Sequence, residues 1–329
     1  MPRILITGSI AYDVLLGYDG SFADALLGQN LDQLSVSFFS PHFRRHHGGT
    51  GANIAWNLRL LGGEPLLVGT VGTDGGSYCA LLEERGIDTT HVERRSDSVT
   101  ATAIIGTDSH ERQVAFFHPG ADALGFWPSA QLSEERDNIA WAVVGPRNPV
   151  IMMQAVRWCA DVGIPLLFDP GQLIIGLSPD ELRFAITRSR GVICNSYEWS
   201  LLRERTGWDS AEVLQHAAFL IVTQGEEGVE LYEKAKGQPF DRAQDKQGKR
   251  TTIAACKPDQ VVNPTGAGDA FRAGLLLGLG KKWSLTESCR LGAVMGSKVV
   301  EIEGTQLDTL DKEEVWERVR MTHGKELPT

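Results

Sequence analysis

The stretch VVNPTGAGDAFRAG, residues 261–274, decides the fold and much of the chemistry of this chain. We expect an apolar strand end at 261–262, then a loop of small residues, then an apolar helix. Gly266 and Gly268 let consecutive backbone N–H groups point into one concavity, and the positive end of the helix dipole adds to it. A phosphoryl group fits such a concavity, and Asp269 in the first helical turn can take the proton of an attacking hydroxyl. A lone aspartate at this position can also simply complement the helix dipole.

Short, continuously apolar runs alternate with helical patterns along the rest of the chain. The apolar runs, typical of parallel strands covered on both faces, lie at residues 4–6, 66–68, 142–144, 166–168, 192–194 and 220–222. Apolar residues at helical spacing cover 52–61, 149–162, 197–206, 270–279 and 285–300. This alternation predicts an α/β fold, a doubly wound, mostly parallel sheet with helices on both faces.

Two regions break the alternation, at about 11–48 and about 98–118. Strand-like pieces in these regions lie at residues 12–16, 34–39, 99–104 and 113–117. The first region shows polar loops and no helical pattern. We interpret both regions as strands of a small separate β-sheet that forms a lid over a cleft. The alternative is an antiparallel extension of the main sheet's edge.

The segment Lys234–Arg250 is polar, mixed in charge and nearly free of apolar residues. It separates strand candidates at 228–232 and 251–255, so we expect a long, mobile hairpin loop, with a substrate flap as the alternative. By length alone, residues 1–329 suit two domains or one large α/β domain, and we expect a single domain with the lid inserted in it.

Composition excludes several classes of function. With 42 Asp and Glu against 32 Lys and Arg, the formal charge is −10, which argues against a nucleic-acid partner. An anionic small molecule stays open, because backbone N–H groups can hold phosphate on an acidic protein. The five cysteines lie far apart, which indicates a reducing compartment and neither a disulfide frame nor a zinc site. No signal-peptide pattern or long apolar run occurs, so we expect a cytoplasmic protein without membrane contact.

Five ordered motifs extend over nearly the whole chain: GGTGAN at 48–53, LVGTVGTD at 67–74 with LLEERGI at 81–87, NSYE at 195–198, VTQG at 222–225 with Gly228, and TGAGD at 265–269. In this order they resemble the ribokinase-like (PfkB) family of sugar and nucleoside kinases. Within that family, the runs at 8–16, 34–49, 197–202 and 263–274 look closest to bacterial adenosine kinases. The G-x-x-x-x-G-K-[ST] phosphate loop and the H-R-D and D-F-G motifs of protein kinases do not occur in the sequence.

The resemblance implies an ATP-dependent phosphotransferase that uses Mg²⁺ and a substrate hydroxyl as acceptor. Asp269 would be the general base, and the amides of Gly266, Ala267 and Gly268 would form the anion hole.

Four residues near the N-terminus would hold substrate hydroxyls by the same resemblance: Ser9, Asp13, Gly49 and Asn53. Asp13 can alternatively be an exposed residue at a strand end, and Asn53 can be a helix cap.

The nucleotide side of the site is also implied by the resemblance. The residues that would contact ATP are Asn195, Thr223, Gly225, Gly228 and Thr265. Glu198, together with Asn195, would organise Mg²⁺ through its waters. Glu198 can alternatively lie on a solvated helix face, and Gly225 can belong to a plain hairpin turn.

One position departs from the family pattern. The family has Asp where this chain has Asn263, and in relatives that bind a monovalent cation this carboxylate helps to coordinate it. Asn keeps an oxygen but loses the charge, so a requirement for a monovalent cation stays open. His46 and His47 lack a third ligand at useful spacing, so we interpret them as part of a hinge between lid and core.

The acceptor is the least defined part of the prediction. A nucleobase needs an apolar or aromatic slot with a few polar contacts, whereas a sugar needs a ring of hydroxyl partners. Phe117 in the lid and Gln172, near the end of a strand, can stack on a purine and bond its edge. We therefore expect the 5′-hydroxyl of a nucleoside such as adenosine, with a ribokinase- or fructokinase-like sugar kinase as the alternative. A non-catalytic binding protein on the same fold and a homodimer through the lid are further hypotheses.

Overall fold

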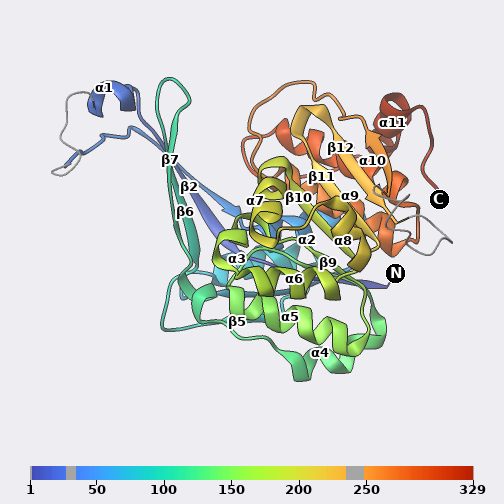
Figure 1. The fold of residues 1–329 in the computed structure, drawn as a ribbon. Coiled ribbons are helices and arrows are strands. Elements are labelled where there is room, and N and C mark those ends of the chain that lie inside the picture. Colours follow the sequence, from blue (N-terminus) through green and yellow to red (C-terminus); the bar gives the residue numbers. More distant parts are fainter. Residues whose placement is uncertain (1, 27–34, 235–247, 329) are drawn as a thin grey trace.

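The computed structural model describes residues 2–26, 35–234 and 248–328. A nine-stranded sheet forms the centre of the molecule (Figure 1). Its strands lie in the order β13 (Lys249–Ile253), β12 (Val229–Glu233), β11 (Phe219–Thr223), β10 (Gly191–Asn195), β9 (Leu166–Phe168), β8 (Ile139–Val144), β1 (Arg3–Thr7), β4 (Pro65–Val71) and β5 (Val92–Arg94). The strands from β11 to β5 pair in parallel, and only the β11–β12 and β12–β13 pairs are antiparallel. The apolar runs are the parallel strands, as predicted.

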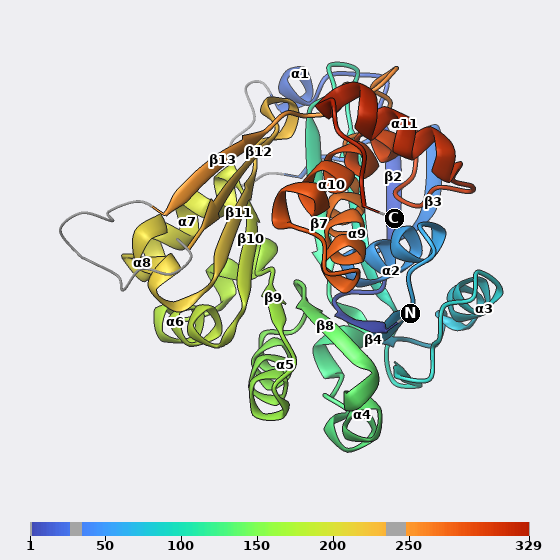
Figure 2. The same cartoon turned by 90° about the vertical axis from the view of Figure 1, so that its right-hand side faces the viewer.

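Helices cover both faces of this sheet, and each face has its own apolar core (Figure 2). In β1, Ile4 and Ile6 join one core and Leu5 joins the other, because successive strand residues point to opposite faces. The first core is completed by α2 (Thr50–Leu60), α3 (Gly76–Glu84), α9 (Ala267–Gly280), α10 (Leu285–Val300) and α11 (Lys312–His323). The second is completed by α4 (Ser129–Glu135), α5 (Pro149–Val162), α6 (Pro179–Arg188), α7 (Ser196–Thr206) and α8 (Ser210–His216). The doubly wound fold is confirmed.

A separate four-stranded sheet forms the lid and projects from the body in Figure 1. Its order is β3 (His42–Gly48), β2 (Ala11–Gly17), β6 (Ala101–Thr107) and β7 (Gln113–His118). β2 and β6 are parallel, and the outer strands pair with them antiparallel. The prediction of a separate small sheet is confirmed, and the alternative of an extension of the main sheet is wrong.

Two details of the lid prediction are wrong. Residues 35–39 form no strand, and the third lid strand is β3 instead. A short helix, α1 (Phe22–Leu26), lies at the far end of the lid where no helix was expected. Phe38 packs its ring 4.9 Å from that of Phe22 and 5.1 Å from that of Tyr18. Of the apolar residues that suggested a strand, Phe38 therefore belongs to an aromatic cluster, and Phe39 is exposed.

The strand expected directly before the small-residue loop is also absent from residues 254–266. Val261 is 73% exposed, and the amides of Val262 and Asn263 donate to the Val300 carbonyl at 2.9 and 3.1 Å. This segment therefore bonds to the end of α10 and forms no strand.

The predicted loop at Lys234–Arg250 falls mainly on residues 235–247, outside the described residues. Its flanks, β12 and β13, pair antiparallel as expected for a hairpin. The five cysteines are all buried and free. Within the described ranges, none of the helices combines the length and apolarity needed to cross a bilayer.

Candidate active site

The candidate site lies at one edge of the main sheet, where its parallel strands end. Ser9 follows β1, Asp169 follows β9, Asn195 ends β10 and Thr223 ends β11. Because parallel strands have their carboxyl ends at the same edge, these residues of distant sequence position face one region.

The loop before α9 has the geometry expected of an anion hole. Gly266 is the N-cap, with φ +84°, and α9 begins at Ala267 without any side-chain cap. A Cβ on Gly266 would lie 2.7 Å from the Thr305 Cβ, so a larger residue does not fit there. The first N–H groups of a helix have no intrahelical partner, and the amide of Gly268 lies in this uncapped first turn. Ala267 differs, since its amide is 3.3 Å from the Pro264 carbonyl.

Asp269 stands in the first turn of α9 and accepts a hydrogen bond from the Asn53 side-chain amide at 2.8 Å. Burial raises the pKa of Asp269 to about 7, and the nearby carboxylates Asp169 and Asp13 act in the same direction. The Asn53 hydrogen bond and the Arg272 guanidinium oppose this rise in pKa. A carboxyl group with a pKa near neutrality is suited to general-base catalysis.

Asp13 lies on lid strand β2, and burial raises the pKa of its carboxyl to about 6, although His46 lowers it. Gly48 makes room for this side chain, since a Cβ there would lie 2.3 Å from Asp13 Oδ2. Gly49 has φ +91°, and its Cβ would lie 2.5 Å from the Ala11 amide nitrogen, so the turn from β3 into α2 requires glycine. The structure thus places Asp13 near Asp269, since the charge of Asp13 raises the Asp269 pKa, and Asn53 bonds to the same Asp269 carboxylate.

Ser9 supports the start of α2. Its hydroxyl oxygen accepts from the Thr50 amide at 3.1 Å, and its carbonyl accepts from the Gly51 amide at 2.9 Å. The hydroxyl proton of Ser9 is not used in these contacts, so a substrate can still accept from it.

The two residues predicted to hold a nucleobase lie on different elements. Phe117 is on β7 and shares a register row with Asp13 through Ala103 of β6, so both side chains point to one face of the lid. Gln172 lies on the 3₁₀ helix η4 (Gly171–Gly176). Phe117 is 60% exposed and Gln172 is also exposed.

The nucleotide-side residues gather at the ends of β10 and β11. Asn195 and Thr223 are register partners there. The Asn195 side chain caps α7 by accepting from the Glu198 amide, and Glu198 Oε2 accepts from the Asn195 amide, both at 2.8 Å. Burial and the charge of Asp169 raise the pKa of Glu198, so the alternative of a solvated helix face is wrong.

The two glycines beyond β11 differ in how much space a side chain would have at their positions. Gly225 has φ +59°, and a Cβ there would meet no atom within 4 Å. Gly228 has φ +96°, and its Cβ would lie 2.2 Å from the Ile253 carbonyl oxygen of β13. Gly228 is therefore required by strand packing as well as by any nucleotide contact. Thr265 is exposed directly before Gly266, and its amide donates to Asn263 Oδ1 at 3.0 Å.

Three sets of residues were missed by sequence reasoning. Arg272 forms a buried ion pair with Asp169, Arg147 forms another with Asp122 at 2.7 Å, and Thr305 and Gln306 surround the Asn53 side chain. A signal existed for the first pair, since Arg272 lies within the glycine motif, one helical turn after Asp269, and Asp169 directly follows a strand. The other two sets show no local pattern.

Comparison with known proteins agrees with this geometry. The chain matches the family described as pfkB family carbohydrate kinase over residues 24–312. The nucleoside kinase of Methanothermobacter thermautotrophicus is 28% identical over 329 residues, which cover 99% of this chain and 98% of that protein. The nucleoside kinase of Thermoplasma acidophilum is 30% identical over 316 residues, 95% of each chain.

A solved structure adds the same family relationship in three dimensions. Burkholderia thailandensis nucleoside kinase in complex with inosine has a TM-score of 0.82 and 31% identity, covering 98% of this chain and 99% of that one. The same enzyme in complex with ADP-inosine has a TM-score of 0.82 and 32% identity, covering 98% and 97%. The resemblance carried by the five sequence motifs is thereby confirmed. The chain belongs to the pfkB family of carbohydrate kinases.

Proposed function

We propose that this protein is an ATP-dependent nucleoside kinase that transfers the γ-phosphoryl group to the 5′-hydroxyl of a nucleoside such as adenosine. The observation that carries the proposal is Asp269, a carboxyl group with a pKa of about 7 in the uncapped first turn of α9, across from Asp13 of the lid. The nucleoside acceptor is supported by the Burkholderia enzyme, whose structure contains inosine and matches 98% of this chain.

In the proposed reaction Asp13, Asn53 and Gly49 hold the hydroxyl edge of the acceptor, and Ser9 supports the same loop. Asp269 takes the proton of the acceptor hydroxyl as its oxygen bonds to the γ-phosphorus. The bond from that phosphorus to the bridging oxygen breaks, and ADP leaves with the electron pair. The amides of the 266–268 loop stabilise the charge on the transferring oxygens.

The nucleotide would lie along Asn195, Thr223, Gly225, Gly228 and Thr265, beyond the anion hole. Within the described residues no group of three or more His, Cys, Asp and Glu side chains is arranged to hold a metal ion. This suits Mg²⁺, which usually binds through one or two carboxylates, phosphates and water. Glu198 fits that role, because its buried carboxylate lies near a second negative charge and a cation would relieve the repulsion. Bound Mg²⁺ would neutralise charge on the nucleotide phosphates.

A monovalent cation is not part of the proposed mechanism. Asn263 Nδ2 donates to the Glu303 carbonyl at 2.7 Å, and Asn263 Oδ1 accepts from the Thr265 amide. The asparagine therefore joins the anion-hole loop to the 301–308 segment with its own N–H group.

We further propose that two copies pair through the outer face of the lid. Val14, Ile104 and Phe116 share one register row, and Leu16, Phe43 and Val114 lie on the same face in a second row. Phe116 is 69% exposed and Phe43 61%, and exposed apolar clusters of this kind mark interaction surfaces. Sedimentation velocity should show a dimer for the wild type and a monomer for Phe43→Ser/Phe116→Ser. The buried free thiols suit a reducing compartment such as the cytoplasm.

The activity test uses Mg-ATP with adenosine, inosine, guanosine, cytidine, ribose and fructose. ADP release is followed, and the phosphorylated position is read by ³¹P–¹H NMR. We expect kcat/KM for the preferred nucleoside to exceed that for either sugar by roughly tenfold or more, about 1.4 kcal/mol. A preference for a sugar overturns the nucleoside assignment and leaves the kinase assignment intact. Binding of acceptors without ADP release would instead support a non-catalytic binding protein.

A further inference from the structure

A series of side-chain hydrogen bonds links lid strand β3 to Asp269. Asn53 Nδ2 donates to Asp269 Oδ2 at 2.8 Å, and Asn53 Oδ1 accepts from Gln306 Nε2 at 3.2 Å. Gln306 Nε2 also donates to the Tyr78 hydroxyl at 2.6 Å, which donates to the Gly48 carbonyl at 2.8 Å. We propose that Gln306 and Tyr78 are positioning residues for phosphoryl transfer, which turn the Asn53 amide so that its NH₂ group faces the base. This rests on the proposed function, because it takes Asp269 as the base.

The Gly48 carbonyl, at the lid end of the series, fixes which group donates and which accepts in every hydrogen bond of the series. A backbone carbonyl can only accept, so the single hydroxyl proton of Tyr78 goes to Gly48. The Tyr78 oxygen must then accept from Gln306, which requires the Gln306 amide to present its nitrogen and both of its hydrogens. Gln306 Nε2 donates one of its hydrogens to the Tyr78 oxygen and the other to Asn53 Oδ1. The Asn53 amide therefore has its oxygen directed away from Asp269.

Thr305 holds the same amide oxygen from a second direction. Its hydroxyl lies 2.9 Å from Asn53 Oδ1 and 3.2 Å from the His47 carbonyl. The same residue packs against Gly266, whose Cβ would lie 2.7 Å from the Thr305 Cβ. Residues 305 and 306 thus contact the anion-hole loop, the substrate helix α2 and the lid strand together.

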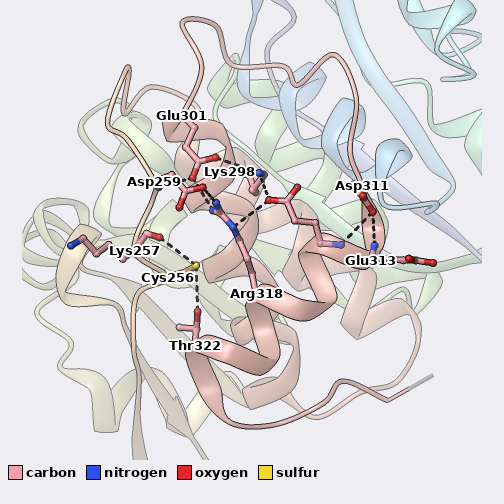
Figure 3. A network of polar contacts seen from close by, with 10 residues as sticks. Cys256, Lys257, Asp259, Lys298, Glu301, Asp311, Glu313, Arg318 and Thr322 are labelled. Carbon is pink, nitrogen blue, oxygen red and sulfur yellow. Dashed lines mark hydrogen bonds and ion pairs between the residues drawn. The ribbon is translucent and has the colours of Figure 1, made fainter.

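The segment that carries Thr305 and Gln306 is fixed at both ends, as Figure 3 shows. At its start, Glu301 accepts from Arg318 Nη1 of α11 at 2.8 Å, and Arg318 also pairs with Asp259. At its end, Asp311 caps α11 by accepting from the Glu313 amide at 2.9 Å. A segment held in this way can place two side chains with the accuracy that a positioning role needs.

The orientation of the Asn53 amide matters because of the charges around Asp269. The charged or titratable groups that face it are Arg272 of α9, Asp169 after β9, Asp13 of β2 and Tyr78 of α3. Arg272 alone among these favours the ionised base, while the two carboxylates disfavour it. If Asn53 Oδ1 faced Asp269 instead, it could accept a hydrogen bond only from the protonated carboxyl group. The protonated, inactive form of Asp269 would then be favoured.

The test exchanges the donor at residue 306 for an acceptor of the same shape. In Gln306→Glu the new carboxylate accepts from Tyr78 and from Asn53 Nδ2, which turns the Asn53 oxygen toward Asp269. We expect the acid limb of the kcat profile to move up by about one pH unit and kcat at pH 7 to fall by about 5- to 10-fold. The rate should recover partly at pH 9, and KM for ATP should stay within about twofold of wild type.

Three further variants complete the design. Gln306→Met removes the donors without adding an acceptor and should shift the acid limb in the same direction by less. Tyr78→Phe should give the smallest shift. Gln131→Glu, on an exposed position of α4, carries the same change in charge and should leave the pH profile unchanged.

A readout independent of turnover separates this inference from the proposed function. ¹³C NMR of the carboxyl groups, with Asp269→Asn to assign the resonance, gives the pKa of Asp269 without any substrate. An unshifted Asp269 pKa in both Gln306→Glu and Gln306→Met overturns the inference, as does a loss of rate that is equal at every pH. Absence of nucleoside turnover in the wild type would overturn the proposed function and leave the NMR result standing.

Discussion

The Arg272 guanidinium donates to both carboxylate oxygens of Asp169, with Nη2 at 2.7 Å from Oδ1, and so ties the end of β9 to α9. Its Nη1 also donates to the Gly268 carbonyl at 3.0 Å. Both members of the pair are buried. One ion pair therefore fixes the helix that carries Asp269. It also supplies the cation that opposes the rise in the Asp269 pKa caused by burial.

Loss of this cation should destabilise the fold strongly. Arg272→Leu leaves Asp169 buried without its partner, which typically costs about 3–5 kcal/mol of unfolding free energy. The control is Arg136→Leu, since Arg136 forms an exposed ion pair with Asp137 at 3.5 Å and such pairs contribute about 0–1 kcal/mol. Urea denaturation of both variants gives the comparison, and equal midpoints would show that the buried pair carries no special weight.

Removal of the base should abolish most turnover while leaving substrate binding intact. Asp269→Asn keeps the hydrogen bond acceptor for Asn53 but cannot take a proton, so kcat should drop by roughly 10²–10⁴-fold. KM for ATP should change little, because in the proposed reaction the nucleotide lies beyond the loop at 266–268. Steady-state kinetics with Mg-ATP check this, and a kcat within a few-fold of wild type would reduce Asp269 to a helix-terminus charge.

The same variant should be more stable than wild type at alkaline pH. The Asp269 pKa is raised from 3.8 to about 7, so the folded state binds a proton more tightly than the unfolded state does. Stability is therefore lost as pH rises through that window, and Asp269→Asn escapes the loss. Thermal unfolding should show a higher Tm for the variant at pH 8 and a smaller difference at pH 5. A variant that is less stable than wild type at pH 8 would contradict the buried, raised-pKa carboxyl.

Phe117 should matter for the nucleoside and not for ATP. If its ring stacks on the base, Phe117→Ala should weaken kcat/KM for the nucleoside by about 1–3 kcal/mol, by analogy with base–aromatic contacts. The matched control is Phe116→Ala on the same strand, whose side chain points to the opposite face of the lid. Equal effects of the two variants on nucleoside kinetics would argue against stacking.

Catalysis should not require potassium. The Asn263 amide already joins the anion-hole loop to the Glu303 carbonyl, so replacing KCl by choline chloride should change kcat by less than about twofold, within 0.4 kcal/mol. In Asn263→Asp the new carboxylate faces that carbonyl without a proton between them. We expect KCl to activate this variant, and we expect neither KCl nor choline chloride to activate the wild type. Strong activation of the wild type by KCl would show that the asparagine does not replace a cation.

Much of the fold was predictable because local patterns decide it. The helices at 149–162 and 285–300 begin where the spacing predicted, since the side chains of Asn148 and Ser284 cap their first turns. Lid strand β3 was missed because its sequence, HFRRHHG, does not alternate apolar and polar residues. It is an edge strand whose side chains are mostly exposed. Backbone pairing with β2 holds it in place, and burial of apolar side chains does not.

The candidate site was predictable only in its local part. The left-handed turn at Gly266 and the position of Asp269 follow from a run of five residues. The partners of Asn53 do not, because Thr305 approaches it from 252 residues away and Gln306 from 253. The Arg272–Asp169 pair spans 103 residues. Contacts of this kind depend on how the two cores assemble, which neither spacing nor composition encodes.

The sequence separation of 216 between Asn53 and Asp269 also sets the order in which the site is completed during translation. At about 5–20 residues per second, a ribosome takes roughly 10–40 s to travel from one to the other. During that time the growing chain has neither Asp269 nor the loop at 266–268. Thr305 and Gln306, which fix the Asn53 amide, emerge later still. The proposed phosphoryl transfer can therefore begin only after most of the chain has been synthesised.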